Sequence, residues 1–158
     1  MNPKVINVVI GGLGGQGVIR ASDVLADAAV RAGFDVKKSE LHGMSQRGGS
    51  VSSDVRFGPQ VLSPMVPAGE ADFLVILAED QVETNRHVLK PGGDLLTPSQ
   101  IPLDKLPVKK GLNVALLGKL SLKLPQIAPE HWRAALKACF PEKLHASNEK
   151  TFALGRGE

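Results

Sequence analysis

Residues 5–18 read VINVVIGGLGGQGV, and this segment predicts the class of fold. Its first part, residues 5–10, is almost wholly apolar and mostly β-branched, which is typical of a strand buried on both faces of a sheet. A glycine-rich turn follows at residues 11–17. From Val18 to Ala32 apolar residues recur at spacings of three and four, which predicts a helix with one buried stripe. The chain therefore begins with a strand, a glycine loop and a helix.

Strands and helices alternate along the rest of the chain. We predict further strands at about 35–40, 51–57, 73–78 and 94–97, and helices at about 80–89, 112–124, 129–140 and 142–154. The strand at 51–57 alternates apolar and polar residues, so we place it antiparallel at an edge, with residues 61–62 pairing back as a hairpin. The pattern predicts an α/β, Rossmann-like three-layer fold with a mostly parallel sheet and an antiparallel edge strand or hairpin. We expect residues 1–158 to form a single domain.

Composition excludes several classes of protein. With 158 residues, 42% of them hydrophobic and 22% charged, the chain is too apolar to be disordered. The formal net charge of +3 gives no support to nucleic-acid binding, and no stretch approaches the roughly 18 apolar residues of a membrane span. The N-terminus lacks the pattern of a signal peptide. We therefore expect a cytoplasmic protein, with neither nucleic acid nor a membrane as its partner.

The cysteine count limits metal and disulfide chemistry. Cys139 is the single cysteine, so no internal disulfide is possible, and a cluster held by about four thiolates cannot sit in this chain alone. The four histidines are scattered and form no recognisable ligand motif. We expect no metal site in this chain.

Residues 12–17 fit the pattern G-x-G-x-x-G, directly after a strand and at the start of a helix. Such glycines let the backbone approach a ligand, and the N–H groups and dipole of the helix favour an anion. The loop is either a phosphate or dinucleotide site or a tight turn without a ligand. Glu40, 23 residues after Gly17, is the candidate partner of a dinucleotide ribose. The candidate cofactor-binding residues are Gly12, Gly14, Gly15, Gln16, Gly17 and Glu40.

A second polar loop follows the second strand, at residues 41–49. Its arginine, Arg47, has a planar fork of donors that suits an anion, and His42 is able to transfer a proton. The alternative is a surface loop whose glycines only shape the backbone. Since ligands bind beyond the carboxyl ends of parallel strands, we expect the loops at 11–17, 41–49 and 78–80 to share one rim. The candidates for a substrate- or partner-facing loop are His42, Gln46, Arg47, Gly48 and Gly49, and no catalytic residue is assigned.

The two loops in this order resemble a known family. Gly12–Val18, Glu40 and His42–Val51 are similar to the gamma-type domain of 2-oxoacid:ferredoxin oxidoreductases, in particular to small (beta) subunits of the indolepyruvate ferredoxin oxidoreductase type. Further similarity lies at residues 63–64, 69–72, 90–93 and 132–152, so the resemblance covers nearly the whole chain.

The resemblance implies a subunit of an oxidoreductase that is not active alone. Such a complex oxidatively decarboxylates a 2-oxo acid, here indolepyruvate or another arylpyruvate, to acyl-CoA with reduction of ferredoxin. No cofactor is expected on this chain alone, because thiamine diphosphate, magnesium and 4Fe-4S clusters are expected in the partner, the large (alpha) subunit. Ferredoxin and CoA would act on the complex.

By the same analogy, the loops 12–17 and 42–49 face the junction with the large subunit, where Arg47 holds the substrate carboxylate or a CoA phosphate. The resemblance leaves open whether the glycine loop binds CoA, a nucleotide or nothing. The alternative function is a free-standing Rossmann-like nucleotide-binding module, which rests on the glycine loop and Glu40.

Overall fold

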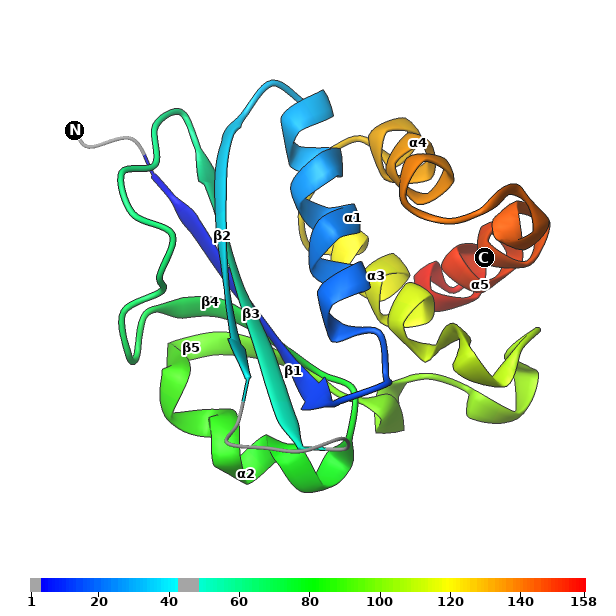
Figure 1. Cartoon of the computed structure of the whole chain (residues 1–158), viewed down its shortest axis with the longest axis horizontal. Helices are drawn as coiled ribbons and strands as arrows, with labels where there is room; N and C mark the ends of the chain where they lie inside the picture. The colour runs from blue at the N-terminus through cyan, green and yellow to red at the C-terminus, as the bar shows by residue number, and fades with distance from the viewer. Residues whose placement is uncertain (1–3, 43–48) are drawn as a thin grey trace.

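The computed structural model describes residues 4–42 and 49–158, which form a five-stranded sheet in the order β2-β3-β1-β4-β5 (Figure 1). The strands are β1 (Ile6–Leu13), β2 (Asp35–His42), β3 (Ser50–Gly58), β4 (Ala71–Ile76) and β5 (Leu89–Leu96). β1, β4 and β5 pair in parallel, whereas β3 is antiparallel to both of its neighbours, β1 and β2. The α/β class, the mostly parallel orientation and the antiparallel strand are confirmed.

The long helices gather on one face of the sheet (Figure 1). They are α1 (Val18–Arg31), α3 (Leu112–Leu122), α4 (Pro129–Cys139) and α5 (His145–Arg156). The opposite face is covered, within the described residues, by the one-turn helix α2 (Val82–Asn85) and the segment 59–70, through Val82 and Val66. The predicted three-layer fold implies helices on both faces of the sheet, whereas this second face has only a thin cover. No helix in the described part of the chain is both long enough and apolar enough to cross a bilayer.

β3 occupies a different place from the one predicted. It lies inside the sheet, between β2 and β1, and not at an edge. Val55 and Phe57, on one side of β3, are fully buried under the helices. On the other side, Asp54 Oδ2 accepts a hydrogen bond from Val66 N (2.9 Å), and Arg56 donates one to the Ser63 carbonyl (2.9 Å). These two bonds hold the segment 59–70. β3 has a polar side because no long helix covers that face of the sheet. An interior strand is able to have such a polar side as well as an edge strand.

The antiparallel pair is formed by β2 and β3, and the predicted return strand at residues 61–62 is wrong. Val61 N instead donates to Asp35 Oδ2 (2.8 Å), so this segment follows the sheet as a loop. The predicted helix at 80–89 is a short α2 between two 3-10 turns, and β5 begins at Leu89. Between Ala71 and Phe73 the partner in β5 jumps from Leu89 to Asp94, so residues 90–93 form an irregularity within the strand.

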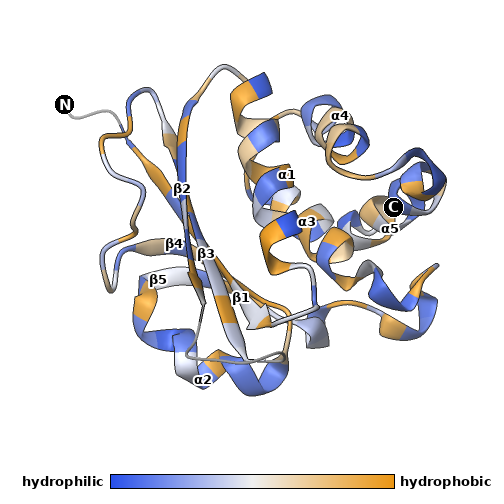
Figure 2. Cartoon of the chain, in the orientation of Figure 1, coloured by the Kyte–Doolittle hydropathy of each residue, from blue (hydrophilic) through white to orange (hydrophobic). Residues whose placement is uncertain are grey.

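α3 is apolar on most sides, and the rest of the chain buries it. It lies between α1 and α5 (Figure 1), and residues such as Leu116, Leu117 and Leu120 are almost inaccessible to water. α3 and α5 approach closely because of Gly118 and Gly155, where a side chain would overlap the backbone of the facing helix. Figure 2 shows both apolar and polar segments on α1, as expected for a helix with one buried and one exposed face.

Candidate functional site

The glycine loop needs glycine at two positions for conformational reasons. Gly15 and Gly17 have φ values of 90° and 84°, in the left-handed region that other residues rarely adopt. Gly17 is also the N-cap of α1, and a Cβ there would overlap the Asn113 side chain. The loop therefore turns tightly from β1 into α1 and leaves the first N–H groups of the helix without side-chain caps.

Gln16 holds this loop in shape. Its Oε1 accepts a hydrogen bond from Leu13 N (2.7 Å), and its Nε2 donates to the Leu77 carbonyl (3.3 Å) at the end of β4. A Cβ at Gly12 would lie 2.8 Å from Gln16 Oε1, so that glycine makes room for the side chain. Both polar atoms of the Gln16 side chain thus stabilise the loop. The sequence predicted instead that Gln16 contacts a ligand.

A cavity of about 550 Å³ opens beside the loop. The N-termini of three helices meet there, since the N-caps of α1, α3 and α5 (Gly17, Gly111 and Leu144) all lie in its wall. Helix N-termini carry partial positive charge and unpaired N–H donors, which favour anions. The lining residues are Gly15, Gln16, Gly17, Arg20, Val108, Lys109, Lys110, Gly111, Asn113, Val114, Phe140, Pro141, Leu144 and Asn148.

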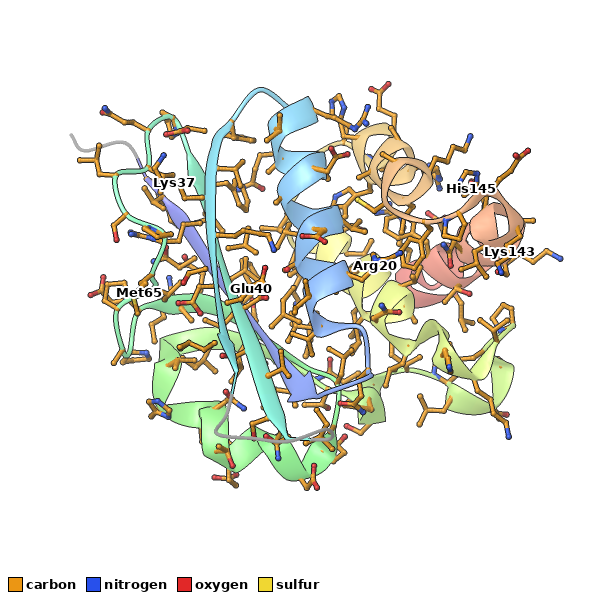
Figure 3. All side chains as sticks on the ribbon, in the orientation of Figure 1. Arg20, Lys37, Glu40, Met65, Lys143 and His145 are labelled. Carbon is orange, nitrogen blue, oxygen red and sulfur yellow. The ribbon has the colours of Figure 1, made fainter. Side chains whose placement is uncertain are left out.

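The charged side chains in that wall have one sign. Arg20, Lys109 and Lys110 line the cavity, and no acidic residue lies in this wall among the residues that the structure describes. Arg20 reaches from α1 toward the C-terminal helices (Figure 3), where its guanidinium donates to the Cys139 carbonyl (2.7 Å) and lies 5.1 Å from the Phe140 ring centroid. Because Arg has five N–H donors, this bond leaves others for a ligand. Three cations and three helix N-termini make the cavity a candidate anion site.

Two asparagines belong to the same wall. Asn113 joins two helix starts, because its Nδ2 donates to the Gly17 carbonyl (3.3 Å) and its Oδ1 accepts from Val114 N (2.9 Å). Asn148, in the first turn of α5, is 4% exposed, and its Nδ2 is buried without a hydrogen-bond partner among the described residues.

The cavity residues outside the glycine loop were missed by sequence reasoning. Lys109 and Lys110 stand directly before the glycine that caps α3, and this pairing of basic residues with a helix start was the one available signal. Phe140 and Asn148 lie in the stretch 132–152 that resembles the family, but no site role was predicted for them, and Asn113 carried no local signal.

Glu40 is not brought to the cavity. β3 stands between β2 and β1, whereas a dinucleotide site of the Rossmann type uses neighbouring strands. Glu40 Oε1 instead accepts from Lys38 Nζ (2.8 Å), which also lies 2.8 Å from Asp23 Oδ1 in α1. Burial lowers the pKa of Lys38, but the hydrogen bonds and charges of Asp23 and Glu40 outweigh burial and raise this pKa above its usual value. Glu40 is thus part of a salt bridge that ties β2 to α1.

The second loop lies largely outside the described residues, which include neither 43–48 nor the side chain of His42. The predictions for His42, Gln46, Arg47 and Gly48 therefore stay predictions. Gly49 is described, and its carbonyl accepts from Gly14 N (2.9 Å), so the end of this loop adjoins the glycine loop. Together with the bond from Gln16 to Leu77, this contact places the ends of β1, β3 and β4 on the shared rim that we expected.

The chain is similar to a known protein family and to several of its members. The family model described as pyruvate ferredoxin/flavodoxin oxidoreductase matches residues 7–158. Indolepyruvate oxidoreductase subunit IorB of Thermococcus kodakarensis is 48% identical over 111 residues, which cover 69% of this chain and 54% of that protein. The subunit of the same name from Pyrococcus horikoshii is 42% identical over 144 residues, which cover 89% of this chain and 68% of that protein. The chain thus spans about half to two thirds of the length of these relatives.

A solved structure shares the fold. It is the 2-oxoglutarate:ferredoxin oxidoreductase of Magnetococcus marinus, with 2-oxoglutarate, coenzyme A and succinyl-CoA bound. The TM-score is 0.80 at 22% sequence identity, and the match covers 99% of this chain and 31% of that one. Since the family model spans nearly the whole sequence, and relatives more than 40% identical align with it, the chain belongs to the pyruvate ferredoxin/flavodoxin oxidoreductase family.

Proposed function

We propose that this chain is the small subunit of a 2-oxoacid:ferredoxin oxidoreductase that acts on indolepyruvate or a related arylpyruvate. The complex would convert the 2-oxo acid and CoA into acyl-CoA and CO₂, and pass the two electrons to ferredoxin. The identity to IorB subunits supports the arylpyruvate as substrate. The large subunit is the proposed partner, and we expect this chain to be inactive without it.

The residues of this chain do not fit the redox cofactors of such a complex. Its one cysteine cannot ligate an iron–sulfur cluster, and no group of three or more His, Cys, Asp or Glu side chains in the described residues is arranged to hold a metal ion. In the proposed complex the large subunit therefore carries thiamine diphosphate, magnesium and the clusters, which supply the decarboxylation and electron-transfer chemistry.

The proposed task of this chain is to bind CoA at the cavity beside the glycine loop. The observation that carries this proposal is the meeting of three helix N-termini with Arg20, Lys109 and Lys110 around one cavity. The phosphates of CoA would accept hydrogen bonds from the N–H groups at the starts of α1 and α3 and from the cations. The relative from Magnetococcus marinus, which shares the fold, was solved with coenzyme A bound.

The loops that are proposed to face the large subunit lie beside this cavity, so a ligand bound there would be able to reach the partner. The carboxyl ends of β1 and β4 and the end of the second loop lie together, and the cavity opens beside them. CoA held by its nucleotide end in the cavity would extend its thiol across this rim toward the large subunit. The loop residues His42, Gln46, Arg47, Gly48 and Gly49 are proposed to face that junction.

The free-standing nucleotide-binding module is the less favoured function. It needs an acidic residue beside the glycine loop, but Glu40 is separated from that loop by β3 and paired with Lys38. Titration of the chain with NAD, NADP and FAD separates the two functions, because binding of any of them in preference to CoA supports the module.

Calorimetric titration of the full chain with CoA tests the proposal. We expect binding that weakens with salt and falls by at least about 100-fold in the double variant Lys109→Glu/Lys110→Glu, since each charge-assisted hydrogen bond contributes about 1.5–3 kcal/mol. The matched control is Lys4→Glu/Lys37→Glu, which changes the net charge equally at two lysines outside the cavity wall (Lys37 is labelled in Figure 3). The proposal fails if the unmodified chain does not bind CoA, or if the control loses as much affinity.

A further inference from the structure

We propose that this chain forms a two-fold symmetric dimer in which the β2 strands of two copies pair antiparallel and join their sheets into one. Such self-association goes beyond the proposed function and does not depend on it, because β2 contributes no residue to the wall of the cavity beside the glycine loop. The proposed interface is an edge of the sheet.

The two edge strands of the sheet differ in how well they accept another strand. An open edge presents unpaired N–H and C=O groups, and proteins often protect it with proline or a bulge. β5 has both features, because Pro91 lacks an N–H, Gly92 has a φ of 80°, and the register with β4 shifts. β2 instead pairs with β3 in continuous register from Asp35 to His42 and contains neither proline nor glycine. Within the described residues, β2 is therefore the edge suited to adding a strand.

The thinly covered face of the sheet has an exposed apolar side chain at this edge. Asp35 lies on that face, where its Oδ2 accepts from Val61 N in the segment 59–70. Leu41 lies on the same side, since side chains alternate along a strand, and it is 56% exposed. A strand added to β2 would cover Leu41.

The helix-covered face also has apolar groups beside this edge. α1 runs alongside β2 (Figure 1), and Asp23 of α1 reaches Lys38 of β2 (2.8 Å). Ile19, Ala26 and Val30 share a stripe of α1 with Asp23, because successive members are three or four residues apart. Val30 is 58% exposed. In the proposed dimer the α1 stripes of the two copies would face each other across the symmetry axis.

Symmetry and charge select one register for the two β2 strands. A two-fold axis that keeps the helices of both copies on the same face of the joined sheet places one residue opposite itself. An axis at Lys37, Lys38 or Glu40 would oppose like charges, which destabilises a strand pair. An axis at Ser39 opposes two small neutral side chains, whereas axes further out pair only the ends of the strand.

The register centred on Ser39 is complementary on both faces. Lys38 of each copy lies opposite Glu40 of the other, so two interchain ion pairs add to the pair within each copy (Lys38 Nζ to Glu40 Oε1, 2.8 Å). On the thinly covered face Lys37 lies opposite Leu41, and its methylene stem would cover that side chain (Lys37 and Glu40 are labelled in Figure 3). Because one surface supplies both halves of each contact, a second copy of this chain fits the edge.

The test combines the mass of the unmodified full chain with cross-linking in a Cys139→Ser background, which removes the native thiol. We expect sedimentation equilibrium to give twice the 16.7 kDa mass of one chain. Ser39→Cys should form an interchain disulfide under mild oxidation, since residues directly opposite in an antiparallel pair have Cα atoms about 4.5–5.5 Å apart, within disulfide range.

Lys37→Cys in the same background is the matched control. Four positions of strand, about 13 Å, would separate its two copies, which is too far for a disulfide. Mixed with Leu41→Cys, however, it should cross-link, because these two positions lie opposite each other. The proposal is overturned if the unmodified chain is a monomer at every concentration, as it would be if the edge instead takes a strand of another protein. Cross-linking of Lys37→Cys alone as fast as Ser39→Cys would also overturn it.

Discussion

The substitution Gly17→Ala tests the junction between the glycine loop and α3. Gly17 has a φ of 84°, and a Cβ there would overlap the side chain of Asn113, whose amide donates to the Gly17 carbonyl. The left-handed conformation costs a non-glycine residue about 1–2 kcal/mol. Displacing the Asn113 amide removes the partner of its Nδ2 donor, while the Gly17 carbonyl keeps its bond from Ala21 N, and this adds about 1–3 kcal/mol. We therefore expect Gly17→Ala to lower the free energy of unfolding in urea by about 2–5 kcal/mol.

Gly15→Ala is the matched control. Gly15 has nearly the same conformation, with a φ of 90°, but a Cβ there meets no atom within 4 Å. Its cost should be the conformational strain alone, about 1–2 kcal/mol. In an Asn113→Ala background the overlap at Gly17 is removed, so the cost of Gly17→Ala should fall to that of Gly15→Ala. Equal costs of the two glycine substitutions in the unmodified background would refute the argument that Asn113 joins the starts of α1 and α3.

Two further predictions concern stability. The raised pKa of Lys38 means that its salt bridges with Asp23 and Glu40 stabilise the fold below the ordinary lysine pKa of 10.5 and are lost as the pH rises above it. Unfolding measured by circular dichroism from pH 9 to 12 should thus show a smaller alkaline loss of stability in Lys38→Met than in the control Lys37→Met. The same loss in both variants would contradict the coupling between deprotonation of Lys38 and the stability of the fold. Gly155→Ala places a methyl group against the Ala115 carbonyl, so α3 and α5 must separate, and we expect a loss of about 1–3 kcal/mol or more in urea unfolding. The exposed Lys150→Ala on the same helix should be nearly neutral, and a neutral Gly155→Ala would show that the two helices have room to move.

The first part of the fold follows from local sequence because its signals are local. The apolar run before Gly11 and the stripe that begins at Val18 each specify one element, and both form where they were predicted. Strand order is not local in this sense. The alternation in residues 51–57 shows one polar face, but it does not say whether the strand lies at an edge or next to β1, since that depends on pairing between distant segments.

In the candidate site, too, the residues with local sequence signals were predictable and those brought together by distant packing were not. The glycine loop was recognisable because its residues are contiguous, whereas Arg20 meets the Cys139 carbonyl across 119 positions of sequence. Glu40 has the sequence spacing of a ribose-binding residue, but the insertion of β3 moves its strand away from β1. Lys109, Lys110 and Asn148 reach the loop only through the packing of α3 against α5, which rests on Gly118 and Gly155. These glycines looked like ordinary helix positions in the sequence.

Reconstitution of the enzyme tests the central proposal most directly. The rate of dye reduction with indolepyruvate and CoA would be measured for the purified large subunit alone, for this chain alone, and for the two together. We expect turnover from the mixture alone, and a Michaelis constant for CoA that rises with Lys109→Glu/Lys110→Glu but not with Lys4→Glu/Lys37→Glu. Steady dye reduction by this chain alone, or full turnover by the large subunit without it, would contradict the proposal.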